Sequence, residues 1–550
     1  MAVFILMPLG YSRHMEAGMR SSERIRHALA RQGLRNLEDI FWDLPSPRLY
    51  EHAIRNREGH IAHLGALVVR TGHFTGRAVH DKFIVDDPAS HDKVWWGRFN
   101  RPFPEPRFDA LFARVCRYLE GRQVYVEDCL VGADSQFERP VRVITQDAWH
   151  ALFARTMFVR PVDLGRDLDI GAPAFTVLHV PHFHAMPSQD GTHSEAFVIL
   201  HLTKRLALIG GTAYAGEIKK SIFTIMNYLL PEEDVLPMHA SANVGPNGDV
   251  AIFFGLSGTG KTSLSSDPER RLLGDDELGW SQHDVFNFEG GCYAKVAGLT
   301  AEKEPLIYAA TERFGTILEN VAFDTLSRRV DFQDTSLTEN TRAAYPIQAI
   351  ANAIYPGVAA QPSHVVMLSA DAFGVLPPIA RLTPAQAMDF FMLGYSTKIA
   401  GTEAGLDAPE ATFSPCFGAP FMARHPCVYA ELLGAKLRRR GAACWLINTG
   451  WSGGPIGVGS RMDIDVSRAV LRAALSGALD DVAYEQDEVF GLQIPCACPG
   501  VDPRLLRPSR TWRDQAAYQR QARQLRDAFD RQLAALRREA SGLGGGSCGG

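Results

Sequence analysis

One segment, GLSGTGKT at residues 255–262, restricts the possible fold more than any other part of the chain. It matches the pattern G-x-x-x-x-G-K-[ST] at every fixed position, and the apolar run 250–254 just before it predicts a buried strand. Glycines allow backbone N–H groups to point at phosphate oxygens, and a helix that begins after the loop adds its dipole. Lys261 can reach the outer phosphates, and Thr262 can offer its hydroxyl to Mg²⁺. The pattern therefore predicts a strand–loop–helix nucleotide site rather than a glycine-rich turn with a solvated lysine.

Composition excludes several classes of protein. The 550 residues are 46% hydrophobic and 22% charged, as in folded globular proteins, and the net charge of −5 argues against a nucleic-acid partner. No apolar run reaches the roughly 18 residues of a membrane span, and the short apolar start, residues 1–9, lacks the basic region of a signal peptide. Nine scattered cysteines without paired C-x-x-C spacing predict reduced thiols and no zinc site. We therefore expect a cytoplasmic protein without a membrane partner.

Strand-like and helix-like segments alternate along the chain, which predicts a mixed fold of the α/β and α+β classes. The expected strands are residues 123–126, 141–145, 179–184, 197–203, 238–244 and 249–254, and the last two flank the hairpin signal GPNG. The expected helices include residues 147–156 and 514–540. Because LLPEED at residues 229–234 interrupts the pattern, we predict an N-terminal domain, 1–234, a phosphate-loop domain, 235–540, and a flexible glycine-rich tail, 541–550.

Three groups near the phosphate loop are candidate metal ligands. Asp275 and Asp276 end a short apolar run soon after Lys261, and a carboxylate at a strand end is a suitable ligand for a hard divalent cation. His239 offers a nitrogen ligand that suits Mn²⁺, and a lysine of the pair 219–220 can ligate when its amine is neutral. Taken alone, the two aspartates suit a capped turn as well as a metal site, whereas such a histidine is more often structural and a lysine pair more often forms a solvated face.

Motifs distributed over most of the chain remove this ambiguity. Between about residues 36 and 468 the sequence resembles ATP-dependent phosphoenolpyruvate carboxykinase, with the family's motifs in the family's order. The matching segments include GALVVRTGHFTGR, YAGEIKK, PMHASAN, GLSGTGKTSLS, LLGDDELGW, FEGGCYAK, ENTRAAYPI, SADAFGVLPPIARL, SPCFGAPF and NTGWSGG. The GTP-dependent class is a poor match, because its phosphate loop typically carries a cysteine that residues 255–262 lack.

The resemblance implies a two-domain carboxykinase-like fold, with the active site in the cleft between an N-terminal substrate-binding domain and the phosphate-loop domain. It also implies the conversion of oxaloacetate and ATP to phosphoenolpyruvate, CO₂ and ADP, in gluconeogenesis, through a metal-stabilised enolate and direct phosphoryl transfer. The substrate residues would be Arg77, Tyr214 and Lys220; Mn²⁺ would be held by Lys220, His239 and Asp276, and Mg²⁺ by Thr262. The nucleotide would be held by Gly255, Leu256, Ser257, Gly258, Thr259, Gly260, Lys261, Thr262, Ser263, Glu304, Arg342, Arg461, Met462 and Ser467. Lys220 and His239 would also belong to the cofactor site, through the Mn²⁺ that they hold, and Lys295 is a further candidate for contact with the phosphates. Arg77, Lys220, Lys261 and Arg342 would be the catalytic residues.

The sequence departs from the family pattern at a few positions. Ala78, Val79 and His80 follow Arg77 where the family commonly has Ser-Pro-Lys, and Leu278 replaces a frequent histidine. Two alternatives are a catalytically silent nucleotide-binding regulator and a serine kinase of the HPr kinase type. A silent regulator should have lost some of the catalytic residues, and a serine kinase of this type should lack the motifs TGHFTGR and ENTRAAYP. The chain has all of these residues and both motifs. We expect a monomer or a small homo-oligomer.

Overall fold

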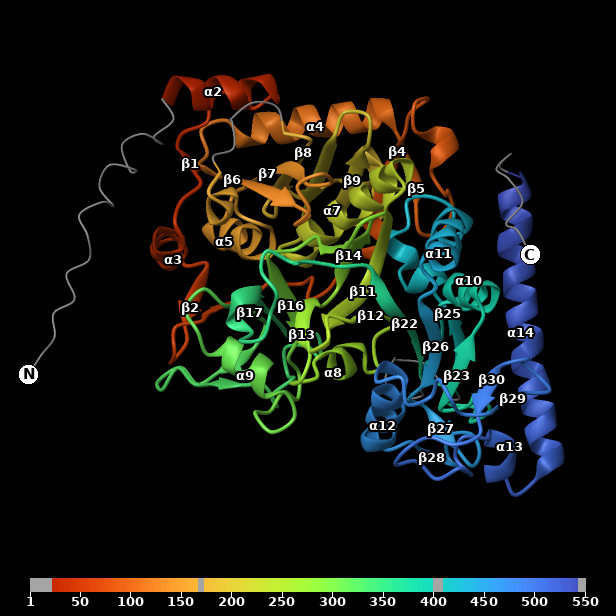
Figure 1. Ribbon diagram of the computed structural model, residues 1–550. Helices are drawn as coiled ribbons and strands as arrows, with labels where there is room; N and C mark the ends of the chain where they lie inside the picture. The colour runs from red at the N-terminus through yellow and green to blue at the C-terminus, as the bar shows by residue number, and fades with distance from the viewer. Residues whose placement is uncertain (1–21, 167–172, 399–408, 543–550) are drawn as a thin grey trace, which may run out of the picture.

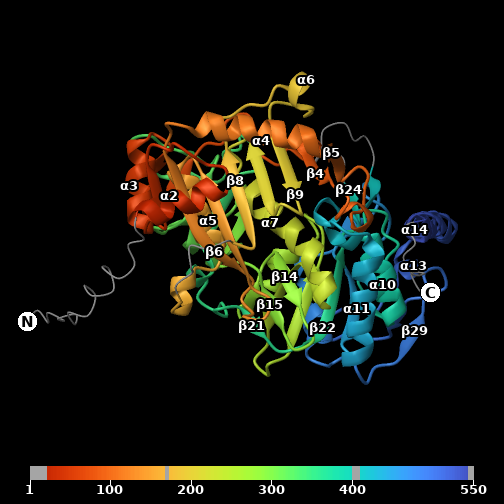
Figure 2. The same ribbon diagram turned by 90° about the horizontal axis from the view of Figure 1, so that it is seen from above.

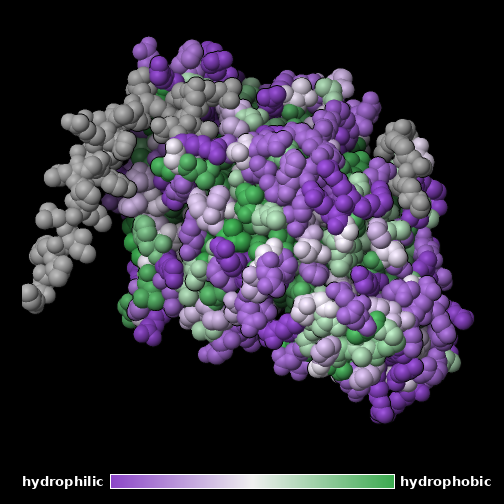
Figure 3. Space-filling view, viewed as in Figure 1, coloured by the Kyte–Doolittle hydropathy of each residue, from purple (hydrophilic) through white to green (hydrophobic). Residues whose placement is uncertain are grey.

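The computed structural model describes residues 22–166, 173–398 and 409–542 (Figure 1). These residues form a mixed α/β structure with three large sheets and several short two-stranded ones. On the face seen in Figure 3, hydrophilic residues predominate and hydrophobic residues are interspersed among them. No helix in the described ranges is both long and apolar enough to cross a membrane.

The first sheet has eight strands in the spatial order β1-β6-β7-β8-β10-β9-β4-β5. Its strands are β1 (Ile40–Trp42), β4 (Lys82–Asp86), β5 (Arg101–Pro104), β6 (Val124–Val131), β7 (Arg139–Thr145), β8 (Phe175–Val180), β9 (Phe197–His201) and β10 (Leu206–Gly210). Helices α2 (Ser22–Arg31) and α4 (Glu105–Leu119) cover one face, and α5 (Ala148–Met157) and α7 (Gly216–Leu229) cover the other (Figure 1, Figure 2). Alternate residues divide between the two faces, since Val124 and Val126 pack with α4 whereas Tyr125 packs with α5 and α7.

The second sheet contains the strand that precedes the phosphate loop. Its order is β21-β15-β14-β11-β12-β22-β26-β23-β30-β29, with β13 paired to β11. The strands are β11 (Leu236–Val244), β12 (Val250–Phe254), β13 (Arg271–Gly274), β14 (Glu277–Trp280), β15 (Val285–Asn287), β21 (Val358–Ala359), β22 (Pro362–Ser369), β23 (Ile379–Leu382), β26 (Ala443–Asn448), β29 (Tyr484–Gln486) and β30 (Gln493–Pro495). The predicted hairpin is confirmed, because β11 and β12 pair antiparallel across the GPNG turn, where Gly248 has a φ of +82°.

A third, five-stranded sheet joins segments that are distant in the sequence. Its order is β16 (Gly291–Lys295), β20 (Arg342–Pro346), β17 (Ile317–Glu319), β3 (Leu67–Val69) and β2 (Gly59–Ile61). Strand β3 pairs parallel with β17, so residues before and after position 234 share this sheet. The largest buried cluster likewise extends from Leu49 to Ala540. The division into domains at residue 234 stays a prediction.

The C-terminal helix follows the predicted amphipathic pattern. Helix α14 (Gln515–Gly542) packs against α10 (Pro384–Leu393) and α11 (Pro426–Arg440) at the edge of the molecule (Figure 1, Figure 2). Its buried residues form one stripe with spacings of three and four: Tyr518, Ala522, Leu525, Phe529, Leu533, Leu536 and Ala540. Positions 541 and 542 belong to this helix, so the predicted flexible tail began too early; its remaining positions, 543–550, lie outside the described residues.

Two further expectations need correction. The predicted strand 179–184 ends at Val180, because Pro181 has no N–H to donate and the chain turns, with the Phe183 N–H donating to the Val180 carbonyl. The thiols of Cys116, Cys129, Cys292, Cys416, Cys444, Cys496 and Cys498 are free, as expected. Cys427, however, is disulfide-bonded, so the expectation of reduced thiols fails at that position.

Candidate active site

One cavity of about 860 Å³ is lined by all of the site residues that the family resemblance implies. They lie on β11, β16, β20 and α7, in the loop after β12, in the turn between β13 and β14, and on α8 (Lys261–Ser265) and α12 (Ile464–Leu475). Arg77, Tyr214 and Glu304 lie in loops, and Arg461 lies on the short strand β28 (Ser460–Arg461). The predicted residues that line it are Arg77, Tyr214, Lys220, His239, Gly255, Leu256, Ser257, Gly258, Thr259, Gly260, Lys261, Thr262, Ser263, Asp276, Lys295, Glu304, Arg342, Arg461, Met462 and Ser467. Of the departures from the family pattern, Ala78, Val79 and His80 do not line it.

The glycines of the phosphate loop are explained by its backbone. Gly258 and Gly260 have φ values of +84° and +85°, a region that side-chain-bearing residues rarely adopt. A Cβ at Gly255 would lie 2.5 Å from Thr259 Oγ1. The same Thr259 hydroxyl donates to the Leu256 carbonyl at 2.8 Å and holds the loop closed. Helix α8 then begins at Lys261, so the strand–loop–helix prediction is confirmed.

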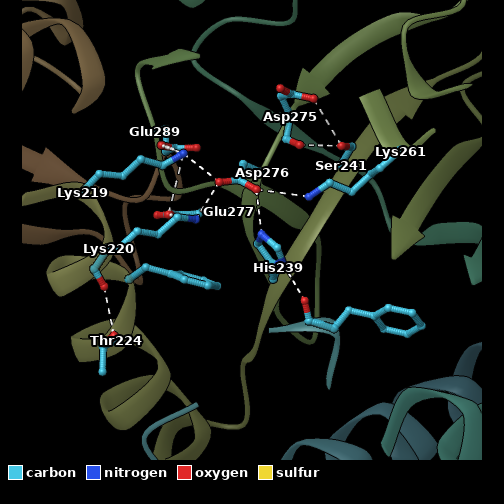
Figure 4. A network of polar contacts seen from close by, with 12 residues as sticks. Lys219, Lys220, Thr224, His239, Ser241, Lys261, Asp275, Asp276, Glu277 and Glu289 are labelled. Atoms are coloured by element: carbon cyan, nitrogen blue, oxygen red, sulfur yellow. Dashed lines mark hydrogen bonds and ion pairs between the residues drawn. The ribbon is translucent and has the colours of Figure 1, made fainter. Parts of the chain in front are cut away.

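Asp276 is the centre of the charged network in the cavity (Figure 4). Its carboxylate oxygens lie 2.8 Å from Lys219 Nζ, 2.7 Å from Lys220 Nζ and 3.1 Å from Lys261 Nζ. His239 Nε2 lies 2.9 Å from Asp276 Oδ1. Four nitrogen groups from α7, β11 and α8 therefore converge on the carboxylate that the sequence singled out.

Two further acidic side chains lie beside the lysines. Lys219 Nζ lies 2.9 Å from Glu289 Oε1, and Lys220 Nζ lies 2.8 Å from Glu277 Oε1. Burial would raise the pKa of Asp276, but the charges of the surrounding lysines hold this pKa well below its ordinary value. For Glu289 the balance is reversed, because burial outweighs Lys219 and raises the pKa of this carboxyl well above its ordinary value. Of these two groups, Asp276 is therefore the one whose ionised form the cluster favours.

His239 has the form that a metal ligand requires. Its Nδ1 lies 2.6 Å from the Phe417 carbonyl, which can only accept, so Nδ1 carries the hydrogen. Burial, together with the charge of Lys261, lowers the pKa of His239 to about 4, so the ring is neutral at pH 7. The lone pair of Nε2 then faces the Asp276 carboxylate, an arrangement that a cation between the two would stabilise. The donor set therefore fits a divalent cation, although the described residues contain no cluster of three or more His, Cys, Asp or Glu side chains that could hold a metal ion.

The side of the cavity next to Arg77 combines cations with an aromatic ring. The Arg77 guanidinium and the Lys220 ammonium each lie 4.5 Å from the centre of the Phe421 ring. Glu217, buried on α7, accepts the N–H of Ala78 at 2.7 Å and so fixes the backbone next to Arg77. Tyr214 is also buried and lies directly before α7. This side of the cavity thus offers a planar guanidinium and an ammonium group to an anion.

Another part of the cavity lining surrounds the phosphate loop. Ser263 Oγ donates to Glu304 at 2.7 Å, and Arg461 donates to the Gly258 carbonyl at 3.0 Å. Arg342 lies over the Tyr293 ring at 5.5 Å and donates to Asn340 at 3.0 Å. Arg461 is therefore held at the phosphate loop, and Arg342 lines the same cavity beside the Tyr293 ring.

Sequence reasoning missed several residues of the network. The sequence predicts Lys219 only as one of two lysines that could ligate a metal or form a solvated face, yet its side chain is 1% exposed. The available signal was its spacing of three and four positions from the apolar Ile222 and Phe223. Glu289 lies in the motif FEGGCYAK but carried no assigned role. Glu217 and Phe421 likewise lie within quoted motifs. Nothing in the local pattern of these residues indicates their partners, because each partner comes from another element.

The mixed α/β fold and this cavity define a protein with a phosphate-binding loop beside a cluster of acidic and basic side chains. A family model described as phosphoenolpyruvate carboxykinase matches residues 38–504. The phosphoenolpyruvate carboxykinase (ATP) of Geobacter metallireducens is 57% identical over 502 residues, 91% of this chain and 94% of that protein. That of Thermus thermophilus is 55% identical over 499 residues, 90% of this chain and 94% of that protein. The chain therefore belongs to the ATP-dependent phosphoenolpyruvate carboxykinase family of enzymes.

Proposed function

We propose that this protein catalyses the ATP-dependent conversion of oxaloacetate to phosphoenolpyruvate, CO₂ and ADP. One observation carries the proposal: a single cavity unites the phosphate loop, the Asp276 network and Arg77. A reaction that couples loss of CO₂ to phosphoryl transfer needs these three parts within reach of one small substrate. Membership of the family, whose relatives are named for this activity, supports the same conclusion.

Each part has a chemical role in this reaction. Arg77 binds a carboxylate of oxaloacetate, since a guanidinium offers two parallel donors to a planar anion, and Tyr214 and Lys220 line the same side. The N–H groups of the phosphate loop bind the triphosphate, while Lys261 and Arg342 stabilise the charge of the transferring phosphoryl group. No nucleophilic side chain is required, because the substrate's own enolate oxygen accepts the phosphoryl group.

The residues also fit the divalent cations that the reaction needs. His239, Asp276 and Lys220, the last through a neutral amine, would hold Mn²⁺, which supplies Lewis-acid stabilisation of the enolate charge when it is bound. Thr262 would contact the Mg²⁺ that accompanies ATP. The ion pair between the Asp276 carboxylate and Lys220 keeps both side chains at this position. The role in gluconeogenesis, the cytoplasmic location, the location of the site between two domains and the oligomeric state stay predictions.

A coupled assay that follows phosphoenolpyruvate tests the proposal. Purified protein receives oxaloacetate with ATP or GTP, with and without Mn²⁺, and the expected result is Mn²⁺-dependent turnover that prefers ATP. A K261M variant serves as the matched control, because it loses the phosphate-loop charge. Nucleotide binding without turnover would refute the enzyme assignment and favour a regulator.

A further inference from the structure

The loop 211–215 connects the end of β10 to the start of α7 and determines where several site residues lie. Tyr214 belongs to the loop, and α7 then carries Glu217, Lys219 and Lys220. Because Glu217 binds the Ala78 N–H, a shift of this loop would also change the position of the backbone beside Arg77. The contacts that hold the loop therefore influence the whole side of the cavity next to Arg77.

Two buried histidines hold the backbone of this loop. His150 Nε2 lies 2.8 Å from the Ala213 carbonyl, and His179 Nε2 lies 3.0 Å from the Thr212 carbonyl. Both histidine side chains are 0% exposed. Since a carbonyl can only accept, both Nε2 atoms carry hydrogen and donate to the loop. Two consecutive carbonyls directly before Tyr214 are therefore fixed, one by His150 on α5 and the other by His179 on β8.

The other nitrogen of each ring has its own polar neighbour. His150 Nδ1 lies 3.2 Å from Asp147 Oδ2, and His179 Nδ1 lies 3.1 Å from Thr145 Oγ1. Thr145 and His179 are paired across β7 and β8, so the pair is built into the sheet. Asp147 also lies 2.7 Å from Nε2 of the more exposed His182. The Thr145 hydroxyl therefore orients the His179 ring, whereas His150 Nδ1 lies near Asp147 without a hydrogen bond to it.

We propose that His150 and His179 are positioning residues that place Tyr214 and the first turn of α7 for binding of the carboxylate substrate. The inference rests on the proposed function for the identity of that substrate. Neither histidine lines the active-site cavity, so their action passes through the loop backbone. Loss of one donor leaves a buried carbonyl without its partner and allows the loop to shift. Binding on the Arg77 side should then weaken, while ATP binding at the phosphate loop should stay unchanged.

Two variants of His150 separate positioning from general packing. His150→Leu removes the donor to Ala213, whereas His150→Gln keeps an amide N–H that can reach the same carbonyl. His201→Leu is the matched control, because His201 is 1% exposed and lies on β9 opposite Leu206, at the far end of β10 from the loop. Calorimetry would measure the Kd of oxalate, a planar dicarboxylate probe, and the Kd of ATP for each protein, and the coupled assay would measure turnover.

We expect His150→Leu to weaken oxalate binding about tenfold, the scale of effects from small misplacements of binding groups. Its Kd for ATP should stay within twofold of wild type, His150→Gln should recover most of the oxalate affinity, and His201→Leu should change neither Kd. An unchanged oxalate Kd in His150→Leu, or equal losses for oxalate and ATP, would overturn the inference. Because oxalate binding is measured without turnover, an inactive wild type would refute the proposed reaction and leave the test of loop positioning intact.

Discussion

Replacement of Asp276 by asparagine should separate turnover from nucleotide binding. The variant loses the carboxylate that lies within 3.1 Å of the Lys219, Lys220 and Lys261 ammonium groups. Loss of a metal ligand in a site that stabilises enolate charge should lower turnover about 1,000-fold, or about 4 kcal/mol. Folding should suffer less, because Lys219 keeps Glu289 and Lys220 keeps Glu277. We expect a loss of about 2 kcal/mol in the free energy of unfolding, below the 3–5 kcal/mol of a fully broken buried pair.

Nucleotide binding without metal should change in the opposite direction. A phosphate oxygen at Lys261 would lie within about 6 Å of the Asp276 carboxylate, and removing one negative charge at that distance is worth up to about 3 kcal/mol at an effective dielectric constant of about 20. We therefore expect Asp276→Asn to bind ATP at least about tenfold more tightly than wild type in the presence of a chelator, since solvent in the cavity reduces the full effect.

Three measurements test this reasoning: turnover in the coupled assay, calorimetric ATP binding in chelator, and urea unfolding. Asp389→Asn is a matched control, because Asp389 pairs with Arg537 between α10 and α14, outside the cavity. Turnover within tenfold of wild type would contradict the assigned metal site. Weaker metal-free ATP binding would contradict the electrostatic account.

Three further changes have defined outcomes. Gly255→Ala should weaken ATP binding at least about tenfold in calorimetry with an unchanged circular dichroism spectrum, because the new Cβ would meet Thr259 Oγ1 and force the loop open; wild-type affinity would contradict this. Arg77→Lys should raise the KM for oxaloacetate about tenfold or more and leave the KM for ATP unchanged, since an ammonium cannot replace the bidentate fork; equal effects on both KM values would count against the assignment. Burial raises the pKa of Glu319, which accepts from Tyr293, to about 8. Between the ordinary value of 4.5 and 8 the native protein therefore holds a proton that the unfolded chain has lost, and stability falls as the pH rises through this window, by up to about 4 kcal/mol. Urea unfolding at pH 5, 6.5 and 8 should show this slope in wild type and not in Glu319→Gln; parallel curves would refute it.

The sequence alone determined the local structure of the phosphate loop and of the strands next to it. Its loop glycines, the preceding apolar strand and the GPNG turn depend on backbone conformations of neighbouring residues, which a local pattern can specify. The amphipathic stripe of the C-terminal helix was readable for the same reason. The family's motifs extended this to a set of residues that all line one cavity.

Only the tertiary structure decided which of those residues form ion pairs with one another. Lys219, His239, Lys261 and Glu289 come from different elements, and nothing in their own segments indicates that Lys219 is buried between two carboxylates. The same holds for His150, which acts on a loop 63 residues further along the chain. Long-range pairing of this kind depends on strand order and helix packing, so local propensity does not encode it. Burial then fixes which carboxylate stays ionised and which histidine nitrogen carries its hydrogen, because desolvation and neighbouring charges exist only after the chain has folded.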